Sequence, residues 1–447
     1  MGKHDLELTI LGGAHNIGAN SCLLEYAGEC LVLDYGMDPS EGAERRNPLP
    51  VPEGKNPLAL ILSHCHLDHS GSVPFFRRRF PGVPVCCTSP TPEMVNILHT
   101  DMYKIAREKN IDCGISCPQD INSTRVLMEE HCLDVLRWYQ LSDTCRVRMH
   151  PAGHVPGAAI TEIEWRDLRV VYTGDFCCHD QGLVRAASTA TIPPGPDLLI
   201  CEGTYAGEER DSSWRDELSR LKDRVLEIIG MHGIVLLPAF AVGRSQELVH
   251  EFGRASITGE LPGDTFLFID GLARGVCRVS ARLPGNEAFK KSYRQFGSAV
   301  ERSNHNTRFR VRDRSIMVAS SGMLHDRSIA RRFLNQLMDE DYDLPAGVFI
   351  SGWLDEASRA KWELLRENAP RDNFTFDEFN LSAHASSTEI LSFAEELKPS
   401  SACMVHWGSQ GDDESARDAF LARLEKSAGG NCLVHAPAEG QVIRPVC

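Results

Sequence analysis

Short apolar runs bounded by glycine or polar turns recur along the first part of the chain, and each has the length of a buried β-strand. The strands that this pattern predicts cover residues 6–11, 20–25, 30–34, 58–62, 169–173 and 197–201. Longer segments predict helices over residues 92–110 and 127–138. This part of the chain is therefore expected to be rich in strands, with helices packed around them.

The pattern changes near residue 204 to an alternation of helix and strand. A charged helix is predicted over residues 214–231, followed by a strand over residues 233–238 and a helix that starts near Ser245. The strands predicted further along cover residues 265–269, 315–319 and 348–350. Strands separated by helices pair in parallel, so this region is expected to be an α/β domain.

The strand-rich pattern returns from about residue 374, with strands predicted over residues 403–406 and 432–435. This layout predicts one domain interrupted by another. The predicted boundaries are 1–204 and 371–447 for the first domain and 205–370 for the inserted one.

Charge and composition exclude several classes of protein. The chain has 47 Lys and Arg against 62 Asp and Glu, a net charge of −15, so it lacks a broadly basic surface, although a local basic groove remains compatible with this total. Apolar runs fall short of the ~20 residues of a membrane span, and the N-terminus lacks the apolar core of a secretory signal. The sixteen cysteines are scattered, which favours reduced, mostly buried thiols and a cytoplasmic protein.

One cluster of metal-ligand side chains follows the strand predicted over residues 58–62. Its order is His-x-His-x-Asp-His, and its members are His64, His66, Asp68 and His69. Imidazole and carboxylate are the ligands that zinc and related divalent ions prefer. Because a loop at a strand end lets such side chains converge, the cluster predicts part of a metal site rather than a histidine-rich surface loop.

Three further residues of the same type stand at predicted strand ends or turns. His154 lies in a glycine-bounded turn, Asp175 follows the strand over residues 169–173, and His406 ends the strand over residues 403–406. Binding loops of an α/β sheet gather at such positions. The predicted donor sets are His64, His66 and His154 for one ion and Asp68, His69 and His406 for the other, with Asp175 as the bridge. Two ions about 3.5–4 Å apart suit hydrolysis, because they activate water and clamp the oxygens of an in-line displacement.

Together with Asp34, these residues resemble the four successive motifs of the metallo-β-lactamase fold. The motifs are Asp34, the cluster at residues 64–69, His154 and Asp175. The resemblance implies an α/β protein built as an αββα sandwich, in which Asp34 orients the metal-binding loop rather than binding metal. Because this fold hosts several kinds of hydrolase, it does not by itself fix the function.

The long interval between Asp175 and His406 leaves room for a whole α/β domain. That arrangement resembles the β-CASP nucleases, in which an α/β cap domain is inserted before the last strands of the sandwich. Glu202, His384 and His406 resemble the three motifs specific to this family, and a histidine at the third motif goes with its RNA-acting members. The resemblance therefore points to the RNA-processing cleavage and polyadenylation endonucleases.

This resemblance implies a metal-dependent ribonuclease that hydrolyses phosphodiester bonds with two divalent ions, zinc being favoured over manganese. The expected substrate is single-stranded RNA, gripped by the cleft itself or through a homodimer. Asp68, His384 and Glu202 are the expected catalytic residues. His384 would donate a proton or a hydrogen bond to the leaving-group side of the phosphate, and Glu202 would hold that imidazole and favour its charged form.

Contacts to the substrate phosphates are expected from the cap. The candidates are Arg244, Ser320 and Ser321. Arg244 follows a glycine at a predicted helix start, a favourable place to meet an anion, and a structural ion pair is the alternative role for it.

Departures from the family pattern leave a second interpretation open. Residues 324–328 and 352–359 are bulkier than the glycine-rich segments that the family has there, and Trp407 separates His406 from Gly408. With the acidic net charge, these departures favour, as the alternative, a hydrolase of a small phosphoester or another small molecule. A binding protein with a dead site is a third interpretation, against which the complete donor set argues.

Overall fold

The computed structural model describes residues 5–38, 46–210, 212–302, 307–309, 312–339, 342–352, 354, 356–408, 411 and 413–445. The chain divides into two compact units. The first unit comprises Met1–Asp180, Val184–Arg210 and His384–Cys447, and the second comprises Gln181–Leu183 and Asp211–Ala383.

Two seven-stranded sheets form the centre of the first unit. One has the strand order β22-β1-β2-β3-β4-β5-β6, with bounds Val442–Ile443, Glu7–Gly12, Ser21–Tyr26, Glu29–Leu33, Leu60–Ile61, Val85–Thr88 and Cys132–Leu133. The other has the order β21-β20-β11-β10-β9-β8-β7, with bounds Leu433–His435, Ser401–Trp407, Leu198–Gly203, Leu168–Tyr172, Ala159–Trp165, Cys145–Pro151 and Trp138–Gln140.

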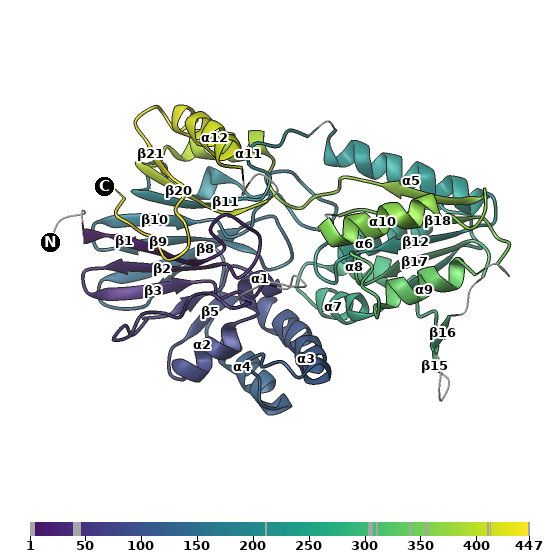
Figure 1. Ribbon diagram of the computed structural model, residues 1–447, viewed down its shortest axis with the longest axis horizontal. Helices are drawn as coiled ribbons and strands as arrows, with labels where there is room; N and C mark the ends of the chain where they lie inside the picture. Colours follow the sequence, from purple (N-terminus) through teal and green to yellow (C-terminus); the bar gives the residue numbers. More distant parts are fainter. Residues whose placement is uncertain are drawn as a thin grey trace. The chain divides into compact units, whose positions relative to one another are not determined.

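Apolar side chains from both sheets share one core, to which Leu24 of β2 and Ile163 of β9 both belong. Helices cover the outer faces: Figure 1 shows α2, α3 and α4 on one side of the sheets and α11 and α12 on the other. The helices of this unit are α1 Leu67–Ser70, α2 Val73–Arg79, α3 Thr91–Lys109, α4 Pro118–Glu130, α11 Ser387–Leu397 and α12 Glu414–Ser427, with a 3₁₀ turn at Thr189–Thr191. The predicted αββα sandwich is confirmed.

Three strands of the second sheet bring distant parts of the sequence to one edge. β10, β11 and β20 are parallel neighbours, with Ile200 of β11 opposite both Tyr172 of β10 and Cys403 of β20. Because parallel strands end at the same edge, the residues at their carboxyl ends are gathered there although they are far apart in the chain.

The second unit is a parallel six-stranded sheet with helices on both faces. Its order is β14-β13-β17-β12-β18-β19, with bounds Phe296–Gly297, Phe266–Asp270, Ser315–Ala319, Ile234–Pro238, Ala346–Ile350 and Phe374–Glu378. A separate antiparallel pair joins β15 Val300–Arg302 to β16 Thr307–Phe309.

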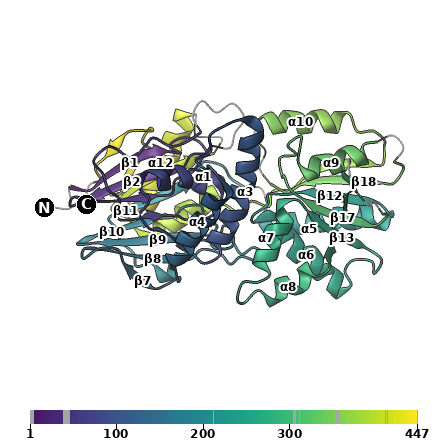
Figure 2. The same ribbon diagram turned by 90° about the horizontal axis from the view of Figure 1, so that it is seen from below.

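Helices α5–α8 share one core of this unit, and α9 and α10 share the other, so the two groups lie on opposite faces of the sheet (Figure 2). Their bounds are α5 Trp214–Gly230, α6 Arg244–Thr258, α7 Leu272–Ser280, α8 Glu287–Tyr293, α9 Ile329–Leu337 and α10 Glu356–Glu367. The predicted α/β character of the insertion is confirmed.

Two details of the sequence-based prediction differ from the structure. The helix predicted over residues 127–138 is wrong: α4 ends at Glu130, and the residues after it extend because Cys132 pairs with Cys87 of β5 and Trp138 pairs with Arg148 of β8. The inserted domain is predicted to span residues 205–370, whereas the second unit of the structure continues to Ala383. The reason is β19, which pairs in parallel with β18 and so belongs to the inserted sheet.

Candidate metal centre

The His-x-His-x-Asp-His cluster begins in the turn after β4 and continues into a short helix. His66 is the residue before α1, Asp68 lies in the first turn of this helix, and His69 lies in its last turn. The sequence predicted a loop here, but a single helical turn carries the second half of the cluster. The turn aims Asp68 and His69 at a different point from His64 and His66, which is how one short segment serves two donor sets.

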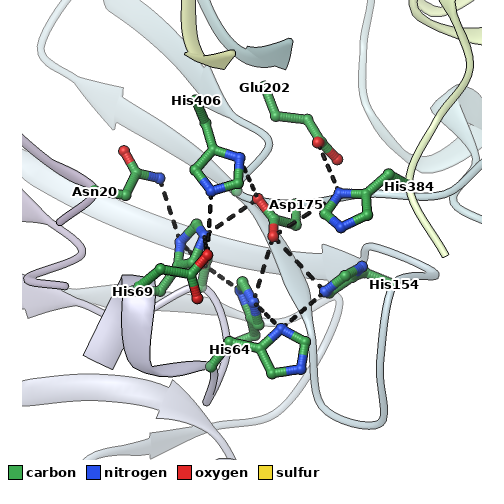
Figure 3. Close-up of polar contacts among 12 residues, drawn as sticks. Asn20, His64, His69, His154, Asp175, Glu202, His384 and His406 are labelled. Atoms are coloured by element: carbon green, nitrogen blue, oxygen red, sulfur yellow. Dashed lines mark hydrogen bonds and ion pairs between the residues drawn. The ribbon is translucent and has the colours of Figure 1, made fainter. Parts of the chain in front are cut away.

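Seven side chains converge as the sequence predicted, in two groups whose donor atoms lie within 4.8 Å of one another. The groups are His64, His66, His154 and Asp175, and Asp68, His69, Asp175 and His406. Asp175 belongs to both, and Figure 3 shows it in the middle of the cluster.

Each oxygen of Asp175 faces one group. Oδ2 lies 3.6 Å from Nε2 of His64 and 3.7 Å from Nε2 of His154. Oδ1 lies 3.2 Å from Nε2 of His69 and 3.5 Å from Nδ1 of His406. A carboxylate with one oxygen toward each donor set has the geometry of a bridging ligand, the role predicted for Asp175.

The buried carboxylates of the centre favour the binding of positive charge. Both oxygens of Asp175 and Nε2 of His69 are buried without a hydrogen-bond partner, which is costly for polar atoms unless a cation is bound. Burial alone would lower the pKa of His69, yet the carboxylates of Asp175, Asp68 and Asp34 hold that pKa well above its ordinary value. The negative charge that favours a proton on His69 would equally favour a metal cation at this site.

Two further imidazoles of the first donor set, His64 and His66, have a lowered pKa, which favours the neutral form that binds metal. Burial is the main cause that holds the pKa of His64 well below its ordinary value, and it lowers the pKa of His66 as well. Nδ1 of His66 lies 3.1 Å from Nε2 of both His64 and His154, so three ring nitrogens face a common point. Nitrogen and carboxylate donors gathered in this way fit a pair of divalent ions.

Asp34 contacts the second donor set through His69, on the side of the ring that faces away from Asp175. Its carboxylate accepts hydrogen bonds from the Ser63 backbone N–H at 2.7 Å, the Ser63 hydroxyl at 2.6 Å, the Tyr172 hydroxyl at 2.6 Å and Nδ1 of His69 at 2.7 Å. The last of these bonds leaves Nε2 of His69 directed at Asp175. Such contacts behind a ligand fix its tautomer and orientation, in agreement with the orienting role predicted for Asp34.

Glu202 and His384 form a second layer beside Asp175. Glu202 lies within β11 and is 1 % exposed; its Oε2 accepts a hydrogen bond from Nδ1 of His384 at 2.8 Å. Its Oε1 accepts one from the backbone N–H of Phe176 at 2.7 Å. Burial would lower the pKa of His384, but the charge of Glu202 and this hydrogen bond outweigh burial and raise it.

Thr204 joins this pair to the metal ligands, a role that the sequence did not predict. Its hydroxyl donates to Oε2 of Glu202 and lies 3.1 Å from Nδ1 of His406. A continuous chain of contacts therefore runs from His384 through Glu202 and Thr204 to His406.

Arg210 supports His384 from the backbone side. Its guanidinium donates to the carbonyl oxygen of His384, lies over the Tyr205 ring at 5.4 Å and approaches Glu389 at 3.9 Å. Nothing in the sequence pattern indicated this role, because Arg210 and His384 are far apart in the chain.

The candidates for phosphate contacts lie in the second unit. Arg244 is the first residue of α6, preceded by Gly243 with φ 86°, and its side chain is buried. Ser320 and Ser321 directly follow β17, the parallel neighbour of β12. These residues stand at the carboxyl edge of the second sheet, and their role in substrate binding stays a prediction.

The family model described as the metallo-beta-lactamase superfamily matches residues 17–225. This segment of the chain is therefore similar to the metallo-β-lactamase superfamily. The match spans the cluster at residues 64–69, His154, Asp175 and Glu202, and the remaining donor, His406, comes from the segment that follows the inserted unit.

Curated relatives align with most of this chain, across both units. Endoribonuclease YSH1 of Mycosarcoma maydis is 27% identical over 97% of this chain and 50% of its own length. Transcription termination factor FttA of Methanothermobacter thermautotrophicus is 26% identical over 88% of this chain and 65% of its own. RNase aCSPSF2 of Saccharolobus solfataricus is 24% identical over 93% of this chain and 82% of its own. The predicted resemblance to the β-CASP nucleases is confirmed.

The chain spans about half to two thirds of the length of the first of these relatives. A crystal structure of a protein of unknown function from Enterococcus faecalis is also similar, with a TM-score of 0.63, 16% identity, and coverage of 98% of this chain and 99% of the other. That likeness shows the fold alone.

Proposed function

We propose that this protein is a metal-dependent ribonuclease that hydrolyses phosphodiester bonds in RNA. The observation that carries the proposal is His384, held by Glu202 next to the bridging Asp175. A donor set of histidines and aspartates serves many hydrolases, but an imidazole with a raised pKa beside it suits a reaction in which the leaving oxygen needs a proton.

The residues of the chain would divide the reaction between them. Asp175 fixes the spacing of the two donor sets, and Asp68 adds negative charge to one of them. His384 would donate its proton to the departing ribose oxygen of the RNA, because Glu202 favours its protonated form. Glu202 would remain in place through its bond to the Phe176 backbone and orient the imidazole throughout the reaction.

Divalent ions held by the two donor sets would supply Lewis-acid activation of water and charge neutralisation at the phosphate. We propose zinc, since three imidazoles and a carboxylate meet in the first set. The carboxylates of the two sets also make the site compatible with manganese, although manganese prefers a larger share of oxygen ligands.

The substrate class is supported by the relatives, two of which are named as an endoribonuclease and an RNase. We propose single-stranded RNA, because an extended strand exposes its phosphates without a duplex to open. A homodimer and a cytoplasmic location stay predictions. Each described cysteine is free, and among the described residues no helix is long and apolar enough to cross a membrane.

The test compares three substrates with protein reconstituted in zinc or manganese. Labelled single-stranded RNA should be cut, single-stranded DNA of the same sequence should be cut far more slowly, and a small chromogenic phosphodiester should react slowest. If metal-loaded protein leaves the RNA intact but hydrolyses the small ester, the ribonuclease proposal is wrong and the protein is a hydrolase of small molecules.

A further inference from the structure

Positive charge is concentrated in one stretch of the second unit, residues 271–298, which covers α7 and α8. Although acidic residues outnumber basic ones in the whole chain, this stretch holds six Lys and Arg and a single acidic residue, Glu287. The six cations are Arg274, Arg278, Arg282, Lys290, Lys291 and Arg294.

Most of these cations are exposed and uncompensated. Arg274 lies 3.8 Å from Asp270, whereas the other five are exposed and make no ion pair with any residue that the structure describes. Elsewhere in this unit, several exposed or half-exposed arginines are paired, as Arg254 is with Glu251 and Glu260. The stretch therefore differs from the ordinary mixed-charge surface around it.

The spacing of the cations places them along helix faces. Arg274 and Arg278 are four residues apart on α7, with Arg282 four residues further along, just after the helix; Lys290 of α8 precedes Arg294, the residue that follows α8, by the same spacing. Like charges at this spacing on a helix repel each other, so the pattern is unfavourable for the isolated fold.

The cations of the stretch other than Arg274 are exposed, whereas apolar positions of both helices are buried. Val276 and Cys277 of α7 and Phe289 of α8 are among the buried positions. The helices pack against each other and against α6 (Figure 2). We call the surface formed by the five exposed cations of this stretch the α7–α8 face; they are Arg278, Arg282, Lys290, Lys291 and Arg294.

We propose that the α7–α8 face binds the phosphate backbone of the RNA substrate, at nucleotides that flank the bond to be cut. This inference rests on the proposed function. A polyanion is the partner that fits a group of exposed cations without an ion pair among the described residues, since lysine and arginine on a polar surface bind phosphates and release condensed counterions.

A protein partner fits the face less well. None of the exposed large apolar side chains of the described residues lies in the stretch 271–298. Stable protein interfaces have a buried apolar centre, which this face lacks, whereas nucleic-acid backbones are held by polar and charged contacts.

The test reverses charge on the face and at matched positions elsewhere in the same unit. The test variant combines Arg278→Glu with Lys291→Glu. The control combines Arg215→Glu of α5 with Lys361→Glu of α10, which are also exposed cations without an ion pair among the described residues. A neutral pair, Arg278→Gln with Lys291→Gln, together with melting temperatures, checks that any effect does not come from misfolding.

Binding of fluorescent single-stranded RNAs of increasing length is measured against salt, in a His384→Ala background that prevents cleavage. Affinity for long RNA should fall at least tenfold in the test variant and change less than twofold in the control. The slope of log affinity against log salt should shrink by about 0.7 for each phosphate that the variant no longer neutralises. RNA too short to extend beyond the scissile bond should bind all variants alike.

Equal affinities of the test and control variants for long RNA would overturn the inference, as would equally tight, face-dependent binding of a poly-glutamate peptide. Cleavage of the short RNA by the parent protein reports on the proposed function separately. Intact cleavage with no dependence on the face removes only this inference, and face-dependent binding without cleavage removes only the proposed function.

Discussion

The two units treat charge in opposite ways. Residues 211–383 of the second unit contain 24 Lys and Arg and 25 Asp and Glu, so this unit is nearly neutral and carries an exposed basic face. The rest of the chain contains 23 and 37, and its functional charges are buried around Asp175. On the proposed function, this contrast separates two tasks: the first unit would hold the cations and perform the chemistry, and the second would attract the anionic RNA.

The largest effect expected is loss of the bridge between the donor sets. Asp175→Asn removes the one carboxylate shared by both sets, so the metal content should fall and RNA cleavage should drop by at least about 10³-fold. Elemental analysis and cleavage assays measure the two effects. The exposed carboxylate Asp143 is the control, because Asp143→Asn should change neither. Full metal content and activity in Asp175→Asn would contradict the bridging role.

Glu202→Gln should separate chemistry from metal binding within the first unit. The neutral amide keeps a hydrogen-bond acceptor but no longer favours a charged His384, so kcat should fall by about 10²–10⁴-fold while KM and metal content stay near those of the parent. Steady-state kinetics and elemental analysis decide between this result and a structural role. Loss of metal in Glu202→Gln would show that Glu202 holds the donor sets together instead.

Thr204 offers a finer test of how the Glu202–His384 pair is connected to the metal-ligand candidate His406. Thr204→Val removes the hydroxyl at nearly constant volume and leaves Oε2 of Glu202 with one donor fewer, so kcat should fall about tenfold. Thr204→Ser restores the hydroxyl and should recover most of the rate. Equal activity of the valine and serine variants would show that the chain from His384 to His406 does not matter for the reaction.

The smallest effect expected concerns Glu389, which lies 3.9 Å from Arg210, the residue that donates a hydrogen bond to the carbonyl oxygen of His384. Burial would raise the pKa of Glu389, but its bonds to His179 and the Ser386 backbone lower it to about 2. A carboxyl whose pKa is depressed in the folded protein stabilises it above the pKa of the unfolded chain, and this contribution is lost as pH falls toward 2. Glu389→Gln should therefore be less stable than the parent at pH 7, with the difference in unfolding free energy shrinking below about pH 4. A difference that does not change with pH would contradict the charge-based account.

The sequence singled out the residues that the structure brings together around Asp175, because each residue type is unusual and stands at a predicted strand end, as His64 and Asp175 do. Thr204, Arg210 and Tyr172 could not be found in this way, since they act on residues that only folding brings near. The end of α4 was missed for the same reason: the pairing of Cys132 with Cys87 overrides the local helical pattern. Likewise, β19 belongs to the second unit only through its pairing with β18.

The most direct test of the central claim is single-turnover cleavage of end-labelled single-stranded RNA by the parent protein and by His384→Ala, with metal content measured on the same samples. The account predicts that both proteins carry the same metal and that only the parent cuts the RNA at an appreciable rate. Equal cleavage by the two, or intact RNA with fully metal-loaded parent protein, would contradict it.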